Sequence, residues 1–262
     1  MSEFIKNFFD NGYHDNLGEG TFGHRHLVWV LATLVCIFAL YFLFKKHKRA
    51  GLIFICTVSA AIFLFRTAIT VHRLIIKLYD PPLSALPWHM CSLLAFLLPV
   101  VIIFDLKKFK TAIYSASVAG GVITLALGDY FDHALITIYL WESMITHSMM
   151  IIMPLIEIAI GRFKIELKNL WQAVAGVLFF MAWATLANEV IFRGHGFNYM
   201  YLKNNALPLE IPGIHYFVLY VVMYIIYLSI FFGAPLLHRR LKAKRSSEGG
   251  QALPAAANAG ME

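Results

Sequence analysis

Seven long apolar stretches constrain this chain more than any other feature of its sequence. They cover residues 25–44, 51–71, 86–104, 111–127, 143–161, 170–192 and 214–237. Each approaches or exceeds the ~17–25 residues that a helix needs to cross the hydrocarbon core of a bilayer. Backbone N–H and C=O groups in lipid must pair within their own segment, so helices are the expected structure. The sequence therefore predicts an all-α, polytopic transmembrane helix bundle with about seven spans.

The composition also indicates that lipid is the solvent of these stretches. Hydrophobic residues make up 60% of the chain and charged residues 14%, against roughly 45–50% and 25% in soluble domains. We expect an extracytoplasmic segment over 1–24, a single transmembrane domain over 25–237, and a tail over 238–262 that is basic and then disordered. No basic region precedes an apolar run at the N-terminus, so we expect no cleavable signal peptide.

The basic residues predict how the bundle is oriented. Of the 22 lysines and arginines, 15 follow the first, third, fifth and seventh apolar stretches, and six lie on the opposite side. The positive-inside rule then places the N-terminus outside and the C-terminus in the cytoplasm. The net charge of +7 is thus explained by topology, and we expect no nucleic-acid partner.

Polar residues from five stretches gather near the predicted outer ends of the spans. Ionisable groups inside a membrane are costly and usually functional. Cys91 and His147 lie four to five residues inside their stretches, at a depth of about 6–8 Å for a helix that rises 1.5 Å per residue. The residues of this layer are Cys91, His147, Arg66, His26, Asn188 and Glu189.

The strongest local motif is the hexapeptide Leu-Pro-Trp-His-Met-Cys that ends at Cys91. A cysteine near a helix start lies in the positive field of the helix N-terminus, which favours the thiolate. A nucleophile also needs a base, and His89, two residues away, faces a different side of the helix. His147 from another span is the better base, and Arg66 or His89 would stabilise an oxyanion.

Each of these residues also has a structural interpretation. Cys91 is equally consistent with inert packing, and His147 with a hydrogen bond to a neighbouring helix. Arg66 can extend to phosphate headgroups, and His89 beside Trp88 can anchor the interface.

Metal, cofactor and disulfide chemistry are not predicted. The cluster Asp129, Asp132 and His133 lacks a regular metal-ligand spacing, so it is expected to form a solvated loop. Three cysteines, an odd number within apolar stretches, do not predict a disulfide framework.

Four motifs, in order along the chain, resemble the YwaF-like integral membrane family. They are Phe-Gly-His-Arg-His at 22–26, the hexapeptide at 86–91, Thr-His-Ser at 146–148, and Asn-Tyr-Met-Tyr-Leu at 198–202. The resemblance extends over roughly residues 21–237. The animal relative of this family is an acyltransferase that remodels ether phospholipids.

The resemblance implies a cysteine-dependent transacylase that needs no cofactor. Cys91 would take an acyl chain from a phospholipid as a thioester, and His147 would be the general base. A lysophospholipid or another hydroxyl acceptor would then receive the chain, with Asn198 and Tyr199 positioning the substrates. The resemblance also implies an integral, multi-pass protein of a bacterial plasma membrane.

Two departures from the family pattern leave the identity of the acyl acceptor open. Two other function classes, a transporter and a ligand receptor, also stay open. Ser148 stands where glycine is expected, and residues 203–210 are less typical. A transporter would need a polar path through the cytoplasmic half, which offers only Asp105 and Glu157. A ligand receptor also stays open, whereas a retinal protein would need a lysine that 214–237 lacks.

Overall fold

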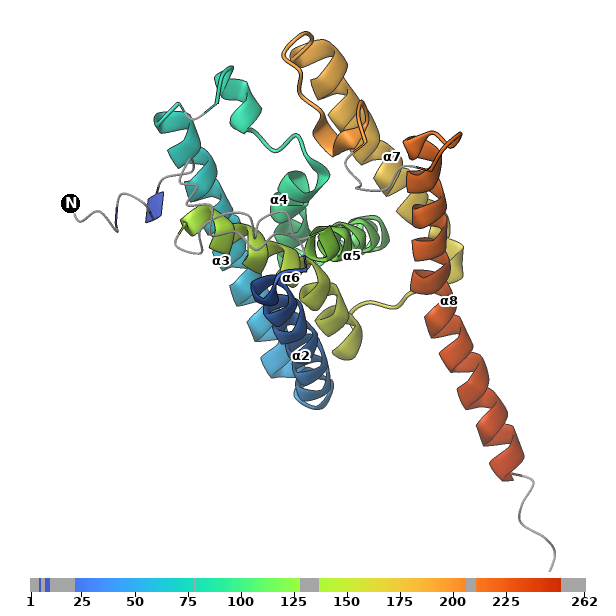
Figure 1. Ribbon diagram of the computed structural model, residues 1–262. Coiled ribbons are helices and arrows are strands. Elements are labelled where there is room, and N and C mark those ends of the chain that lie inside the picture. The colour runs from blue at the N-terminus through green and yellow to red at the C-terminus, as the bar shows by residue number, and fades with distance from the viewer. Residues whose placement is uncertain are drawn as a thin grey trace, which may run out of the picture. The chain divides into compact units, whose positions relative to one another are not determined.

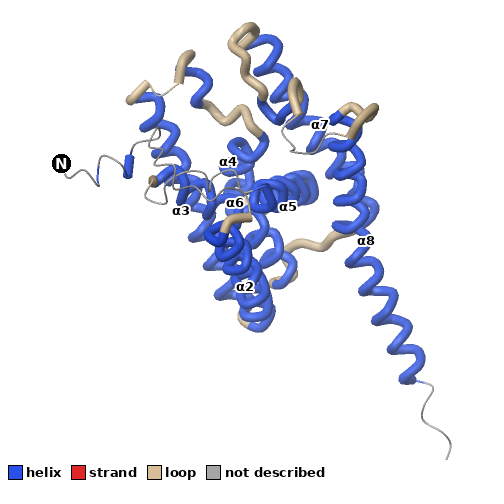
Figure 2. The backbone as a smooth tube through the Cα atoms, in the orientation of Figure 1, coloured by secondary structure: helices blue, strands red, loops and turns tan. Residues whose placement is uncertain are grey.

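Helices joined by loops and turns make up the residues that the structure describes, and these contain no strand (Figure 2). The computed structural model describes Ile5, Phe8, Phe9 and residues 22–77, 79–127, 137–205 and 211–250, apart from the side chains of 239 and 245–250. The long helices are α2 (His24–Lys46), α3 (Lys48–Ile75), α4 (Met90–Ile103), α5 (Lys110–Leu127), α6 (Ile138–Ala159), α7 (Leu170–Leu186) and α8 (Tyr216–Gly250). Short helical turns are η1 (Pro82–Ala85), η3 (Leu167–Asn169), η4 (Ala187–Ile191) and η5 (Tyr199–Tyr201).

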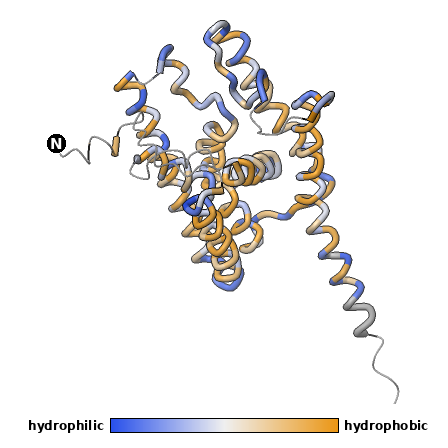
Figure 3. Tube along the Cα trace, viewed as in Figure 1, coloured by the Kyte–Doolittle hydropathy of each residue, from blue (hydrophilic) through white to orange (hydrophobic). Residues whose placement is uncertain are grey.

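Six of the described helices are long and apolar enough to cross a membrane. Hydrophobic residues cover the middle of these helices (Figure 3). Each of the seven predicted stretches contains one long helix, which confirms the all-α membrane bundle predicted from the sequence.

The third stretch forms a shorter helix than predicted. We expected helix from residue 86, but α4 begins at Met90 and has 14 residues, which is about 21 Å. Leu86 is extended, with φ −70° and ψ 164°, because a residue that precedes proline is disfavoured in the helical region. His89 is also extended and caps the start of α4.

The chain divides into two compact units. The first contains Met1–Lys164 with Lys168–Pro208, and the second Ile165–Leu167 with Leu209–Glu262. In the first unit α6 packs against α2, α3, α4 and α5, and α5 also packs against α7 (Figure 1). About 72% of the apolar window of α6 is buried and 61% of that of α5, against 11% for α2. Helices α5 and α6 therefore form the core of this unit. The second unit contains the single long helix α8.

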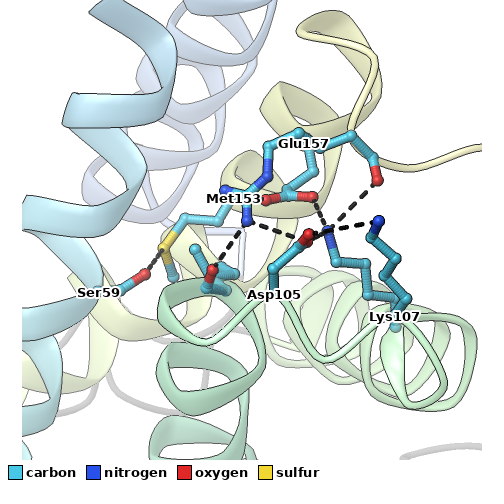
Figure 4. A network of polar contacts seen from close by, with 8 residues as sticks. Ser59, Asp105, Lys107, Met153 and Glu157 are labelled. Carbon is cyan, nitrogen blue, oxygen red and sulfur yellow. Dashed lines mark hydrogen bonds and ion pairs between the residues drawn. The ribbon is translucent and has the colours of Figure 1, made fainter. Parts of the chain in front are cut away.

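An ion-pair network joins the ends of α4, α5 and α6 (Figure 4). Lys110 Nζ lies 2.6 Å from Asp105 Oδ1 and 2.5 Å from Glu157 Oε2. Arg162 pairs with the same two carboxylates at 3.0 and 3.1 Å. Burial by itself would raise the pKa of Asp105, but Lys110 and Arg162 together hold it below its usual range. Asp105 and Glu157, the two carboxylates that a transport path through the cytoplasmic half would use, are thus paired with cations.

Candidate active site

Arg66 connects three helices near the end of the bundle that the positive-inside rule assigns to the outside. Its Nη1 donates to Glu142 Oε2 at 2.8 Å, and its Nη2 donates to Ser92 Oγ at 2.9 Å. Thr146 Oγ1 donates to the second carboxylate oxygen of Glu142 at 3.2 Å. Glu142 is 2% exposed and Arg66 12%, so the pair is desolvated and each charge compensates the other. This contact fixes α3, α4 and α6 relative to one another.

Sequence reasoning missed Glu142. The fifth stretch was predicted to begin at residue 143, but α6 begins at Ile138 and therefore includes Glu142. The available signal was the spacing of Glu142 and Thr146, which places an acceptor and a donor on one helix face, four residues apart.

Cys91 is the second residue of α4 and faces α5. His89 caps this helix without a side-chain hydrogen bond to its first N–H groups. The Cys91 thiol lies 3.9 Å from Thr124 Oγ1. A Cβ atom added at Gly120 would come within 3.1 Å of Cys91 Sγ. The thiol therefore occupies space that is open only because α5 has a glycine there.

His147 lies on α6, which packs against α5 at Gly121, the residue after Gly120. Its Nδ1 is 2.7 Å from the carbonyl oxygen of Ser143. A carbonyl only accepts, so Nδ1 carries the hydrogen, and Nε2 is the acceptor nitrogen of the neutral ring. A Cβ atom at Gly121 would come within 2.8 Å of the His147 carbonyl oxygen. The Cys91 thiol and the backbone of His147 thus lie against adjacent residues of α5, and Arg66 interacts electrostatically with both side chains.

His26 and Ser148 attach α2 to this region. His26 is 2% exposed, and its Nε2 donates to the carbonyl oxygen of Leu125 at 2.6 Å. Leu125 follows Thr124, the residue beside the thiol. Ser148 Oγ accepts from Trp29 Nε1 at 3.1 Å and lies 3.0 Å from Thr33 Oγ1. The serine that departs from the family pattern is therefore used in packing α2 against α6.

The structure docks the two most specific motifs, residues 86–91 and 198–202, on each other. The backbone N–H of Met200 donates to His89 Nδ1 at 3.4 Å, and the Tyr199 ring lies 5.0 Å from the His89 ring. Asn188 holds both backbone groups of Tyr199, with Oδ1 2.8 Å from its N–H and Nδ2 3.0 Å from its carbonyl oxygen. Asn188 belongs to η4, a π-helical turn that continues α7, and such turns frequently occur at functional sites.

Three of the predicted substrate-binding residues lie in or beside this docked segment, each with a different environment. Asn198 Oδ1 accepts from the Lys203 N–H at 2.9 Å and so stabilises the turn. Glu189 is 56% exposed and pairs with Lys203 at 3.2 Å. Tyr199 is 5% exposed, and its hydroxyl has no hydrogen-bond partner in the described part of the chain. Burial raises the pKa of Tyr199 to about 12, so this hydroxyl is a donor at neutral pH. The substrate-binding roles of these residues stay predictions.

The described residues contain neither a metal-binding cluster nor a disulfide. No group of three His, Cys, Asp or Glu side chains there could hold a metal ion, and Cys36, Cys56 and Cys91 are free thiols. The cluster Asp129, Asp132 and His133 lies outside the described residues.

Comparison with known proteins gives one match. No curated protein and no solved structure matches the chain. The sequence model of the TMEM164 family matches residues 21–234, close to the range over which the motifs resemble a known family. The match names this family and not a bacterial YwaF-like one, so the bacterial membrane stays a prediction. Since the match extends over most of the chain, this protein belongs to the TMEM164 family.

Proposed function

We propose that this protein is a membrane phospholipid transacylase that uses Cys91 as its nucleophile and His147 as its general base. The observation that carries the proposal is that the Cys91 thiol and the backbone of His147 lie against adjacent glycines of α5, and that Arg66 interacts electrostatically with both side chains. Membership of the TMEM164 family, to which the animal ether-lipid acyltransferase belongs, is consistent with this activity.

In the first half-reaction the thiol takes an acyl chain from a phospholipid. His147 Nε2 removes the proton from Cys91 as Sγ attacks the ester carbonyl carbon. The oxyanion of the tetrahedral intermediate lies near the uncapped N–H groups of the first turn of α4 and the guanidinium of Arg66. When the ester C–O bond breaks, the leaving lysophospholipid oxygen takes the proton from His147, and a thioester remains on Cys91.

The second half-reaction runs the same chemistry in reverse with a new alcohol. His147 removes the proton from the acceptor hydroxyl, which attacks the thioester carbonyl. The thiolate leaves and recovers its proton from His147, and the acceptor carries the acyl chain. A lysophospholipid is the acceptor that a lipid environment supplies most directly, and no soluble acyl donor is needed.

Intact mass spectrometry of the purified protein after incubation with phospholipid tests the nucleophile. We expect a hydroxylamine-sensitive acyl adduct on the wild type and none on Cys91→Ala. The matched controls are Cys36→Ala and Cys56→Ala, which remove the other thiols and should keep the adduct. An adduct that persists in Cys91→Ala, or no adduct together with unchanged lipids, contradicts the proposal.

A further inference from the structure

Arg73, near the end of α3, is a partly buried cation that forms no ion pair of its own with a carboxylate among the described residues. Its Nε is buried and has no hydrogen-bond partner, and within the described ranges no ion pair involves it. Its guanidinium carbon lies 4.9 Å from the ring centre of Tyr139 and 5.8 Å from that of Tyr79. Aromatic faces attract the cation and orient its plane. The two rings offer no hydrogen-bond acceptor in the plane of the guanidinium, and its buried Nε–H has no acceptor among the described residues.

A second arginine and one shared carboxylate lie near Arg73 in the described part of the chain. Arg66 lies seven residues earlier on α3, which places both arginines on one helix face about 10 Å apart. Arg66 and Glu142 both interact electrostatically with Arg73. Glu142 is already bonded to Arg66 at 2.8 Å, so two guanidinium groups share one carboxylate. An unpaired cation is costly to bury, and a bound anion would remove that cost.

Tyr199 supplies a second donor without a hydrogen-bond partner among the described residues, and it interacts electrostatically with Tyr79. The Tyr199 hydroxyl is buried without a hydrogen-bond partner in the described part of the chain, on a side chain that is 5% exposed. Tyr79 interacts electrostatically with both Tyr199 and Arg73. A guanidinium fork and a hydroxyl are donors that suit the oxygens of a phosphate group.

The depth of Arg73 matches the position of a lipid phosphate. Arg66 donates to Ser92, the neighbour of Cys91, at 2.9 Å, so Arg66 marks the level of the thiol. Arg73 lies about 10 Å further along α3, toward the end predicted to face outside. In a bilayer the phosphates lie on the aqueous side of the ester groups, within a headgroup layer roughly 5–8 Å thick.

We propose that Arg73, assisted by Tyr199, binds the phosphate of the phospholipid whose acyl ester reaches Cys91. This assignment rests on the proposed function. It makes the protein selective for lipids that carry a phosphate over neutral glycerolipids with the same chains.

Native mass spectrometry of the purified protein tests the assignment without requiring turnover. The protein is offered equal amounts of phosphatidylcholine and diacylglycerol with identical chains. We expect the wild type to retain the phospholipid about 10- to 100-fold more, the range for hydrogen bonds to a charged group. Arg73→Gln should lose this preference, and Arg193→Gln, which removes an exposed arginine, should keep it.

Three results would overturn the assignment. They are equal retention of both lipids by the wild type, an unchanged preference in Arg73→Gln, and complete displacement of phosphatidylcholine by inorganic phosphate. The last would indicate a site for free phosphate. If Arg73→Gln does not fold, Tyr199→Phe removes only the hydroxyl and should reduce the preference about threefold to tenfold.

Acyl-adduct formation on Cys91 separates this inference from the proposed function. A preference for phospholipid without any acyl adduct would support the phosphate site and contradict the transacylase activity. An adduct that forms equally fast from phosphatidylcholine and diacylglycerol would support the transacylase activity and contradict the phosphate site.

Discussion

Glu142 is the single residue on which the arrangement of the candidate site depends most. Its carboxylate accepts from Arg66 at 2.8 Å and from Thr146 at 3.2 Å, and it is 2% exposed. Removing one member of a buried ion pair leaves the other charge buried and unpaired, which costs more than replacing both members by apolar residues.

Glu142→Ala is therefore expected to lower the free energy of unfolding by about 3–5 kcal/mol. Thermal unfolding in detergent measures this loss. The exposed Glu189 supplies the control, since Glu189→Ala breaks only a surface ion pair and should change stability by less than about 1 kcal/mol. Replacing Arg66 and Glu142 together by methionine should cost less than Glu142→Ala; a larger loss in the double variant would contradict this account of the pair.

His147→Gln is expected to slow acyl transfer about 10²- to 10⁴-fold, because it removes the general base while keeping a polar side chain of similar size. Quenched time points of thioester formation on Cys91, followed by intact mass spectrometry, give the rate. His47→Gln is the matched control, because it makes the same replacement at an exposed histidine between α2 and α3. A rate that is unchanged in His147→Gln assigns the base elsewhere.

At the scale of elements, α5 sets the spacing of the helices that carry the candidate nucleophile and base. Gly120 leaves room for the thiol on α4, and Gly121 lets the backbone of α6 approach closely. Small residues at helix contacts are typical of membrane bundles, where close backbone approach supplies much of the packing energy.

Gly121→Ala is expected to destabilise the bundle by about 1–3 kcal/mol, the usual cost of overpacking. The added Cβ would lie 2.7 Å from Ile151 Cγ1 and 2.8 Å from the His147 carbonyl oxygen, and that backbone oxygen cannot rotate away. Gly233→Ala in α8 is the control, since its Cβ would meet nothing within 4 Å. The two variants are compared by thermal unfolding; equal stability would show that α5 and α6 can separate without cost.

At the scale of the whole molecule, the ion-pair network of Asp105, Lys110, Glu157 and Arg162 predicts how stability depends on pH. The pKa of Asp105 is lowered in the folded protein by Lys110 and Arg162, against the effect of burial. A lowered pKa means that the Asp105 contribution is complete above its unfolded value of about 3.9. The contribution is lost as pH falls through the lower folded value.

Asp105→Asn should therefore be less stable than the wild type at pH 7, and the difference should shrink as pH falls below about 4. Unfolding temperatures measured between neutral and acid pH check this. Asp80→Asn changes an exposed aspartate and should follow the wild type. A difference in unfolding temperature between wild type and Asp105→Asn that grows as pH falls would contradict this predicted pH dependence.

The predicted orientation of the molecule has a direct test. An N-terminal epitope tag should bind antibody on intact cells, and a C-terminal tag only after the membrane is permeabilised. An odd number of crossings, with α4 included, requires the two tags to lie on opposite sides. Equal accessibility of both tags would mean that one of the seven helices does not cross.

The sequence determined the helices of this protein because lipid permits almost no other backbone structure for long apolar stretches. Each of the seven stretches contains a helix, and six are long enough to span a membrane. The third was placed several residues too early, before the extended segment at Pro87, and the fifth five residues too late. The motifs around Cys91, His147 and Tyr199 were also recognisable, because they are local runs of residues.

Tertiary structure decided which of these residues meet. Glu142 lay outside the predicted fifth stretch, and the structure places it on α6 against Arg66, 76 positions away. Arg73 appeared in the sequence only as one of the basic residues, and it became a candidate lipid contact because two tyrosine rings lie beside it while Glu142 is paired with Arg66. The physical reason is that burial and pairing depend on neighbours from other helices. Hydropathy along one helix carries no information about those neighbours.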